Sequence, residues 1–150
     1  GFRSCRSVAE LLNYQLRLFR PDEVQLVGGS GPEDLDLGAF RSGEAVVVIG
    51  FAPYSTASVV SARAAHAARA NLIAIADSVS APMAEGADHL LLYESASSPG
   101  FFPSLIGATA IAQSLAAATF ALGGTVAKKR LEETEARLAA TSQYVSEKGS

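Results

Sequence analysis

The sequence predicts an α/β fold, a doubly wound parallel β-sheet flanked by helices. Two apolar runs at residues 45–49 and 72–76 have the composition of strands that are buried on both faces. A helical pattern at residues 55–70 separates them, and the order strand, helix, strand requires a crossover between parallel strands. The 150 residues suffice for one domain with a substantial core.

The remaining elements follow from periodicity and from the positions of Gly and Pro. Apolar residues at helical spacing predict a helix over residues 7–19, which Pro21 ends. A short strand is expected at 24–27, a loop at 28–32 and a short helix at 33–40. A loop at 77–82 precedes one helical turn at 83–86, and the last strand is expected at 89–93.

The C-terminal third predicts two helices of different character. No charged residue occurs from Ser95 to Ala127, so the helix expected from Phe102 to Leu122 is apolar nearly all round. Its polar interruptions argue against a membrane span and favour burial on two sides in a homodimer. After Gly123-Gly124, a charged helix is expected at 127–145, with a heptad stripe that packs on a neighbour. That stripe consists of Leu131, Leu138 and Val145.

Composition restricts the possible partners. The net charge of −3 provides no basic field that would attract nucleic acid. The single cysteine, Cys5, allows no internal disulfide and is compatible with a cytoplasmic location. Cys5, His66 and His89 are not paired at zinc-binding spacing, so neither a metal nor another cofactor is expected.

Ligands of open parallel sheets bind beyond the carboxyl ends of the strands. Segments 1–5, 50–58, 77–80 and 94–98 are expected at that edge, and all are rich in Gly, Ser or Thr. Ser55 and Thr56 open a helix there, either to bind an anion or only to cap the helix. Asp77 is either a ligand contact or a turn residue, and Glu94 either binds a sugar hydroxyl or amine or is a loop carboxylate.

Several motifs together resemble the sugar isomerase (SIS) domain of RpiR-type bacterial transcriptional regulators. They are Gly1-Phe2-Arg3-Ser4, residues 49–55 (IGFAPYS), residues 75–82 (IADSVSAP), Ala87-Asp88, and Glu94-Ser95 followed by residues 101–105 (FFPSL). The resemblance covers essentially the whole chain. It implies an SIS-type, flavodoxin-like αβα fold in three layers, a dimer, and an effector-sensing domain that binds a phosphorylated sugar or a related sugar acid.

The resemblance also assigns site residues. The family holds the sugar phosphate with a serine of the first motif, matched by Ser4, and with a Ser-x-Ser-Gly-x-Thr loop. Here Gly50, Ala52 and Pro53 replace that loop's two serines and its glycine, so only Ser55 keeps a hydroxyl. We therefore expect modest phosphate affinity through Ser4, Ser55, Thr56 and Arg3, or a ligand whose acid group is held differently. Arg3 is either a bidentate clamp or a surface arginine.

Two other function classes were weighed. SIS domains also occur in phosphosugar isomerases and aminosugar-phosphate enzymes, which need an acid and a base at the sugar. His66 is expected mid-helix and His89 at the opposite edge of the sheet, so a binding domain is preferred to an enzyme. Gly28-Gly29-Ser30-Gly31 suggests a dinucleotide site, but Pro32 and acidic residues follow and no Gly-x-Gly-x-x-Gly spacing exists.

The first residues read as a strand-to-helix turn without its strand. We therefore expect that residues 1–150 are one SIS-like domain of a longer protein, whose first strand lies upstream or is missing. Any contact with DNA is expected through a domain outside this chain.

Overall fold

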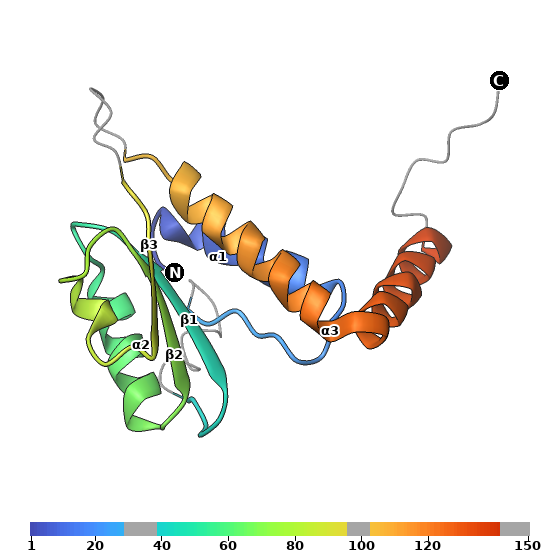
Figure 1. Cartoon of the computed structure of the whole chain (residues 1–150), viewed down its shortest axis with the longest axis horizontal. Helices are drawn as coiled ribbons and strands as arrows, with labels where there is room; N and C mark the ends of the chain where they lie inside the picture. The colour runs from blue at the N-terminus through green and yellow to red at the C-terminus, as the bar shows by residue number, and fades with distance from the viewer. Residues whose placement is uncertain (29–38, 96–102, 142–150) are drawn as a thin grey trace.

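The chain forms a parallel sheet with helices on both faces (Figure 1). The computed structural model describes residues 1–28, 39–95 and 103–141. Within them, β1 (Ala45–Gly50), β2 (Asn71–Ala76) and β3 (His89–Leu92) pair in parallel in the order β1-β2-β3. Helices α1 (Cys5–Arg17) and α3 (Ile106–Ala140) cover one face, and α2 (Thr56–Ala67) covers the other (Figure 1). The predicted three-layer α/β class is confirmed.

Each face of the sheet has its own core. On the face of α2, small and apolar side chains pack closely; the largest that are fully buried are Leu72 and Met83. On the other face, α1 and the first half of α3 bury side chains of both helices against the strands. These are Cys5, Val8, Ala9, Leu12, Ile49, Ile75, Tyr93, Ala108, Ala112 and Ala116. Alternate residues of β1 and β2 thus supply the two cores: Ile49 and Ile75 belong to the core of α1 and α3, and Val48 and Ala74 to the core on the face of α2.

Three predicted strands are confirmed, and the fourth is wrong. Residues 24–27 pair with no strand among the described residues, although Leu26 packs against the core of α1 and α3. The Val27 carbonyl instead accepts a 3.4 Å hydrogen bond from the Arg6 guanidinium. Apolar residues at 24–27 therefore serve packing without sheet pairing, which composition alone does not distinguish.

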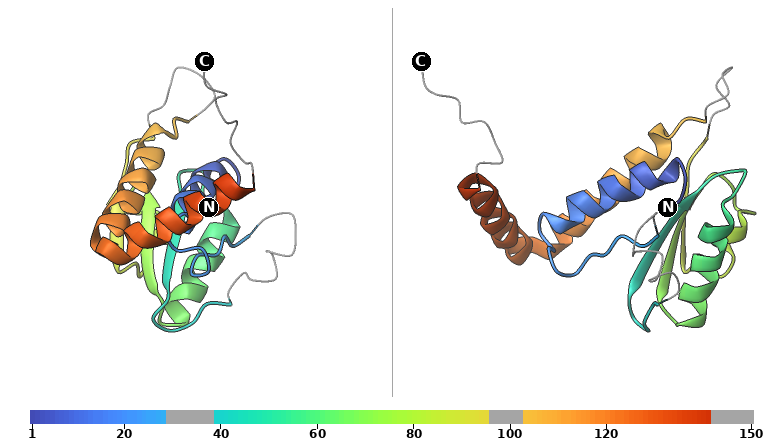
Figure 2. Two further views of the ribbon diagram at one scale, coloured as in Figure 1. Left: turned by 90° about the vertical axis from the view of Figure 1, so that its right-hand side faces the viewer. Right: turned by 180° about the vertical axis from the view of Figure 1, so that it is seen from behind.

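The two predicted C-terminal helices are confirmed as two helical segments of α3 that join at a kink. Gly123 stays within α3, and only Gly124 departs from helical geometry, with φ 54° and ψ −137°. The second half of α3 leaves the body at an angle (Figure 2). We name its residues 125–140 the arm. Leu131 and Leu138 are half-buried, as expected for a packing stripe, whereas Val145 lies outside the described residues.

Other expectations differ in small ways or cannot be compared. Helix α1 begins two residues before the predicted start, and the turn at 83–86 is a short 3-10 helix, η2 (Pro82–Ala84). Most of the loop expected at 28–32 and of the helix expected at 33–40 lies outside the described residues, as does the start of the helix expected from Phe102. By length and composition alone, α3 could cross a membrane.

Candidate functional site

The carboxyl ends of the three strands lie side by side. In the strand register Gly50 is opposite Ala76, and Ala76 is opposite Leu92. The segments that follow, residues 51–55, 77–81 and 93–95, therefore emerge at one edge, which we name the carboxyl edge. Helix α1 also begins near it, since Cys5 belongs to the same core cluster as Ile49 and Tyr93.

Residues 50–54 form a loop that its neighbours hold in place. The Tyr93 hydroxyl donates a 3.3 Å hydrogen bond to the Gly50 carbonyl. A β-carbon at Gly50 would lie 2.5 Å from the Met83 sulfur, so no larger residue fits there without a shift. Burial raises the pKa of the Tyr93 hydroxyl, which keeps it protonated and able to donate.

Asp77 binds this loop through both carboxylate oxygens. Oδ2 accepts hydrogen bonds from the Ala52 backbone N–H at 3.1 Å and from Ser95 Oγ at 3.2 Å. Oδ1 accepts one from the Tyr54 hydroxyl at 2.8 Å. Burial, and then this hydrogen bond with Asp77, raises the pKa of Tyr54 to about 12. Asp77 therefore connects the loop after β1 with the segment after β3.

The start of α2 leaves anion-binding groups open. Ser55 is the N-cap in an extended conformation, but its side chain makes no capping hydrogen bond. Its carbonyl accepts the backbone N–H groups of Ser58 at 3.0 Å and Val59 at 3.3 Å. Ser55 is therefore the N-cap by position but not through its side chain. Within the described residues, its hydroxyl and the backbone N–H groups of Thr56 and Ala57 have no hydrogen-bond partner. Thr56, the first helical residue, is exposed.

Arg3 and Ser4 lie directly before α1, and both are exposed. Ser4 makes no side-chain capping bond; its carbonyl accepts the Ser7 hydroxyl at 2.8 Å. Arg3 has a φ of 53°, in the left-handed region that residues other than glycine rarely adopt. No ion pair of the Arg3 guanidinium occurs within the described ranges. Such strained backbone is common at ligand sites.

Glu94 follows β3 and is exposed, with no hydrogen bond or ion pair to the described part of the chain. The structure thus places five of the six predicted site residues on segments around the carboxyl edge with polar groups open, namely Arg3, Ser4, Ser55, Thr56 and Glu94. Asp77 lies there too, but protein donors occupy both of its oxygens. Whether a ligand contacts these residues remains a prediction.

Sequence reasoning missed the residues that fix the loop. Tyr54, Tyr93 and Ser95 all donate to groups that are far from them in the chain. In the sequence, the one indication of their importance was that Tyr54 and Ser95 belong to the motifs of the family resemblance, next to the predicted site residues Ser55 and Glu94. The hydroxyls of Ser78 and Ser80, which are 2.9 Å apart, also lie in the segment after β2.

No acid–base pair is visible at this edge in the part of the chain that the structure describes. His66 is exposed in the last turn of α2, near Gly86, and His89 is the first residue of β3, at the opposite end of the strand. The placement of His89 agrees with the prediction, whereas His66 was expected mid-helix and lies in the last turn because α2 ends at Ala67, earlier than predicted. Residues 1–28, 39–95 and 103–141 contain no group of three or more His, Cys, Asp or Glu side chains that could hold a metal ion.

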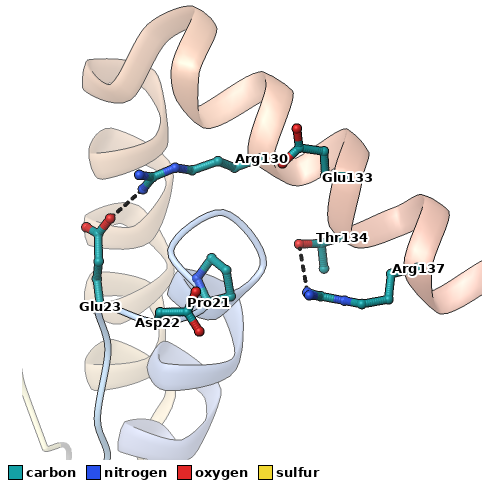
Figure 3. Close-up of a pocket in the computed structure, with 7 residues that line it drawn as sticks. All are labelled: Pro21, Asp22, Glu23, Arg130, Glu133, Thr134 and Arg137. Atoms are coloured by element: carbon teal, nitrogen blue, oxygen red, sulfur yellow. Dashed lines mark hydrogen bonds and ion pairs between the residues drawn. The ribbon is translucent and has the colours of Figure 1, made fainter.

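Two cavities are formed by described residues. One, of about 200 Å³, lies between the arm and the turn after α1 (Figure 3). It is lined by Pro21, Asp22, Glu23, Arg130, Glu133, Thr134 and Arg137. The other is a shallow groove on the first turns of α3, lined by residues such as Ile106 and Gln113. That the strand ends converge on one pocket remains a prediction.

Comparison with known proteins gives structural matches only. No family model and no curated protein matches this chain. The sugar isomerase domain of an RpiR transcription factor from Sphaerobacter thermophilus superposes with a TM-score of 0.75 at 22% sequence identity, over 87% of this chain and 72% of that one. The Vibrio vulnificus NanR protein, complexed with ManNAc-6P, superposes with a TM-score of 0.76 at 12% identity, over 96% of this chain and 55% of that one. The chain therefore has the fold of the sugar isomerase domain of RpiR transcription factors, as its motifs predicted.

Proposed function

We propose that this chain is the effector-sensing domain of a cytoplasmic transcriptional regulator. It binds an anionic sugar derivative, a phosphorylated sugar or a related sugar acid, at the carboxyl edge. The observation that carries the proposal is the start of α2, where the Ser55 hydroxyl and the first helical N–H groups are open to an anion. Ser4 and Arg3 offer a further hydroxyl and a guanidinium at the start of α1.

The comparisons support this proposal in outline. One structural neighbour is a transcription factor's sugar isomerase domain, and the other was solved with a sugar phosphate. Both histidines lie away from the carboxyl edge, which favours a sensor over the alternative, a phosphosugar isomerase or aminosugar-phosphate enzyme.

Assembly and DNA reading belong to the same proposal. The exposed, uncharged face of the first half of α3 would pair with a second copy in a homodimer. With a net charge of −3, residues 1–150 have no basic field for DNA, so another part of the regulator would read it.

The test is a thermal-shift screen of sugar phosphates, aminosugar phosphates and sugar acids. A ligand present at 100 times its dissociation constant adds about 2.7 kcal/mol of stability. Calorimetry on the best ligand should show a loss of about tenfold or more for Ser4→Ala combined with Ser55→Ala, because each removes a hydrogen bond to an anion.

Thr141→Ala is the matched control, since Thr141 is an exposed hydroxyl at the far end of α3. Equal binding by the double variant and the wild type would place the site elsewhere. If NMR shows that the protein converts the bound sugar to an isomer, the chain is instead an enzyme, as in the alternative of a phosphosugar isomerase.

A further inference from the structure

The charged groups around the carboxyl edge are predominantly negative. Arg3 precedes α1, Asp77 follows β2 and Glu94 follows β3, which gives one positive and two negative side chains. The next charged residues along α1, Arg6 and Glu10, form an ion pair of 2.9 Å and compensate each other. From Ser95 to Ala127 the sequence contributes no charge. Among the described residues, these three side chains at the edge carry a formal net charge of −1.

The loop after β1 offers few donors to an anion. Gly50 has no side chain, and the Met83 sulfur occupies the space that one would need. The Ala52 N–H is already bound to Asp77, and Pro53 has no N–H. Gly50 and Pro53 thus contribute no side-chain donor, and the Ala52 N–H is occupied. The donors that remain are Ser55, the start of α2, Ser4 and Arg3, beside the hydroxyls of Ser78 and Ser80, which are bonded to each other.

The negative charge of the edge and its small number of free donors affect a phosphate ester and a carboxylate differently. A phosphate ester carries a charge of about −1.5 to −2 near pH 7 and has three acceptor oxygens to satisfy. Two nearby carboxylates disfavour such a dianion, and the loop leaves its oxygens short of donors. A carboxylate carries a single negative charge on two oxygens, which matches the planar fork of one guanidinium.

Resting on the function proposed above, we infer that the carboxyl edge selects a sugar acid, held by its carboxylate, over a sugar phosphate. Arg3 pairs with the carboxylate, together with Ser55 and the N–H groups at the start of α2. Glu94, whose carboxylate has no described partner, accepts hydrogen bonds from hydroxyls or an ammonium group of the same ligand. Asp77 keeps the loop in place and adds the charge that disfavours a phosphate.

Calorimetry with paired ligands tests the selection. The pairs share a sugar ring and differ in the anionic group: glucuronate against glucose 6-phosphate, galacturonate against galactose 6-phosphate, and mannuronate against mannose 6-phosphate. In the pair that binds, the acid should bind about tenfold or more tightly than the phosphate. A phosphate that binds as tightly as its acid overturns this inference and leaves the proposed function standing. If none of the six binds but another sugar phosphate of the thermal-shift screen does, the inference is overturned and the proposed function stands.

Glu94→Gln identifies the cause of the selection. Removing one negative charge should shift the ratio of acid to phosphate affinity toward the phosphate by on the order of threefold to tenfold. Glu132→Gln is the matched control, because Glu132 is an exposed carboxylate on the arm, paired with Lys128 at 4.0 Å. An unchanged ratio in Glu94→Gln would show that the charge at the edge does not select the ligand.

Discussion

The two halves of α3 differ in what holds them. The first half packs on α1 and the sheet through three buried alanines, Ala108, Ala112 and Ala116, and its end is fixed by an edge-to-face contact of Phe19 with Phe120, with ring centroids 5.1 Å apart. The arm contacts the body through fewer side chains, with only Ala127 and Thr134 buried. Yet the first half carries no charge on its exposed face, whereas the arm is covered with charged residues.

This contrast indicates which exposed surface of α3 is suited to contact with solvent. A helix that is apolar on all sides is normally buried on all sides. In the first half of α3, however, Ile106 is 79% exposed and Leu122 is 89% exposed. The arm has the solvated surface of an ordinary amphipathic helix. The outer face of the first half is therefore the surface that a second copy would cover, in the homodimer proposed above.

The largest expected effect comes from the inner face of the first half. Ala112 is fully buried at 0% exposure, so Ala112→Asp would place an unpaired carboxylate in the core. We expect a loss of about 3 kcal/mol or more in the free energy of unfolding. Urea denaturation measures it, and a loss below about 1 kcal/mol would contradict the packing of α3 on the sheet.

The matched change lies on the outer face of the same helix. Ala117 is exposed, so Ala117→Asp should change the unfolding free energy of the monomer by no more than about 0.5 kcal/mol. In a dimer it would place charges in an apolar interface and weaken self-association by about a hundredfold. Sedimentation velocity at micromolar concentration distinguishes the two forms. A wild type that stays monomeric there would contradict the homodimer.

The same contrast shows what the sequence could predict. β1, β2 and β3 were identified because runs such as Val46–Ile49 are apolar and β-branched, and α1 because its apolar residues repeat at helical spacing. The break between the two halves of α3 was predicted at Gly123-Gly124. That Gly123 remains helical and only Gly124 departs was not predicted, because either glycine can end a helix. The role of Asp77 depends on donors from residues 52, 54 and 95, which only the fold brings together.

The junction of the two halves depends on Gly124. Its φ of 54° with ψ of −137° is accessible to glycine and strained for other residues. A β-carbon at Gly124 would meet nothing within 4 Å, so Gly124→Ala tests backbone conformation alone. We expect either a loss of about 1–2 kcal/mol or a straightened α3. Small-angle scattering would show the second outcome as a longer maximum dimension, and a variant with unchanged stability and shape would contradict the kink.

The smallest expected effect concerns the ion pair that joins the arm to the body. Arg130 of the arm binds the Glu23 carboxylate (Figure 3). The same carboxylate also accepts a 2.9 Å hydrogen bond from Arg20. The hydrogen bond from Arg130, with the positive charge of both arginines, lowers the pKa of Glu23. Because the folded pKa is depressed, the stabilisation is present above the ordinary glutamate pKa of about 4.3 and is lost as the pH falls through the folded value.

Hydrogen exchange of the arm should therefore be faster at acidic pH than at pH 7, after correction for the intrinsic rate, and Glu23→Gln should remove most of that difference. Glu133→Gln, which alters only a pair within the arm at 3.8 Å, should retain it. Equal pH dependence in Glu23→Gln and the wild type would mean that the arm is held by the packing of Ala127 and Thr134 alone.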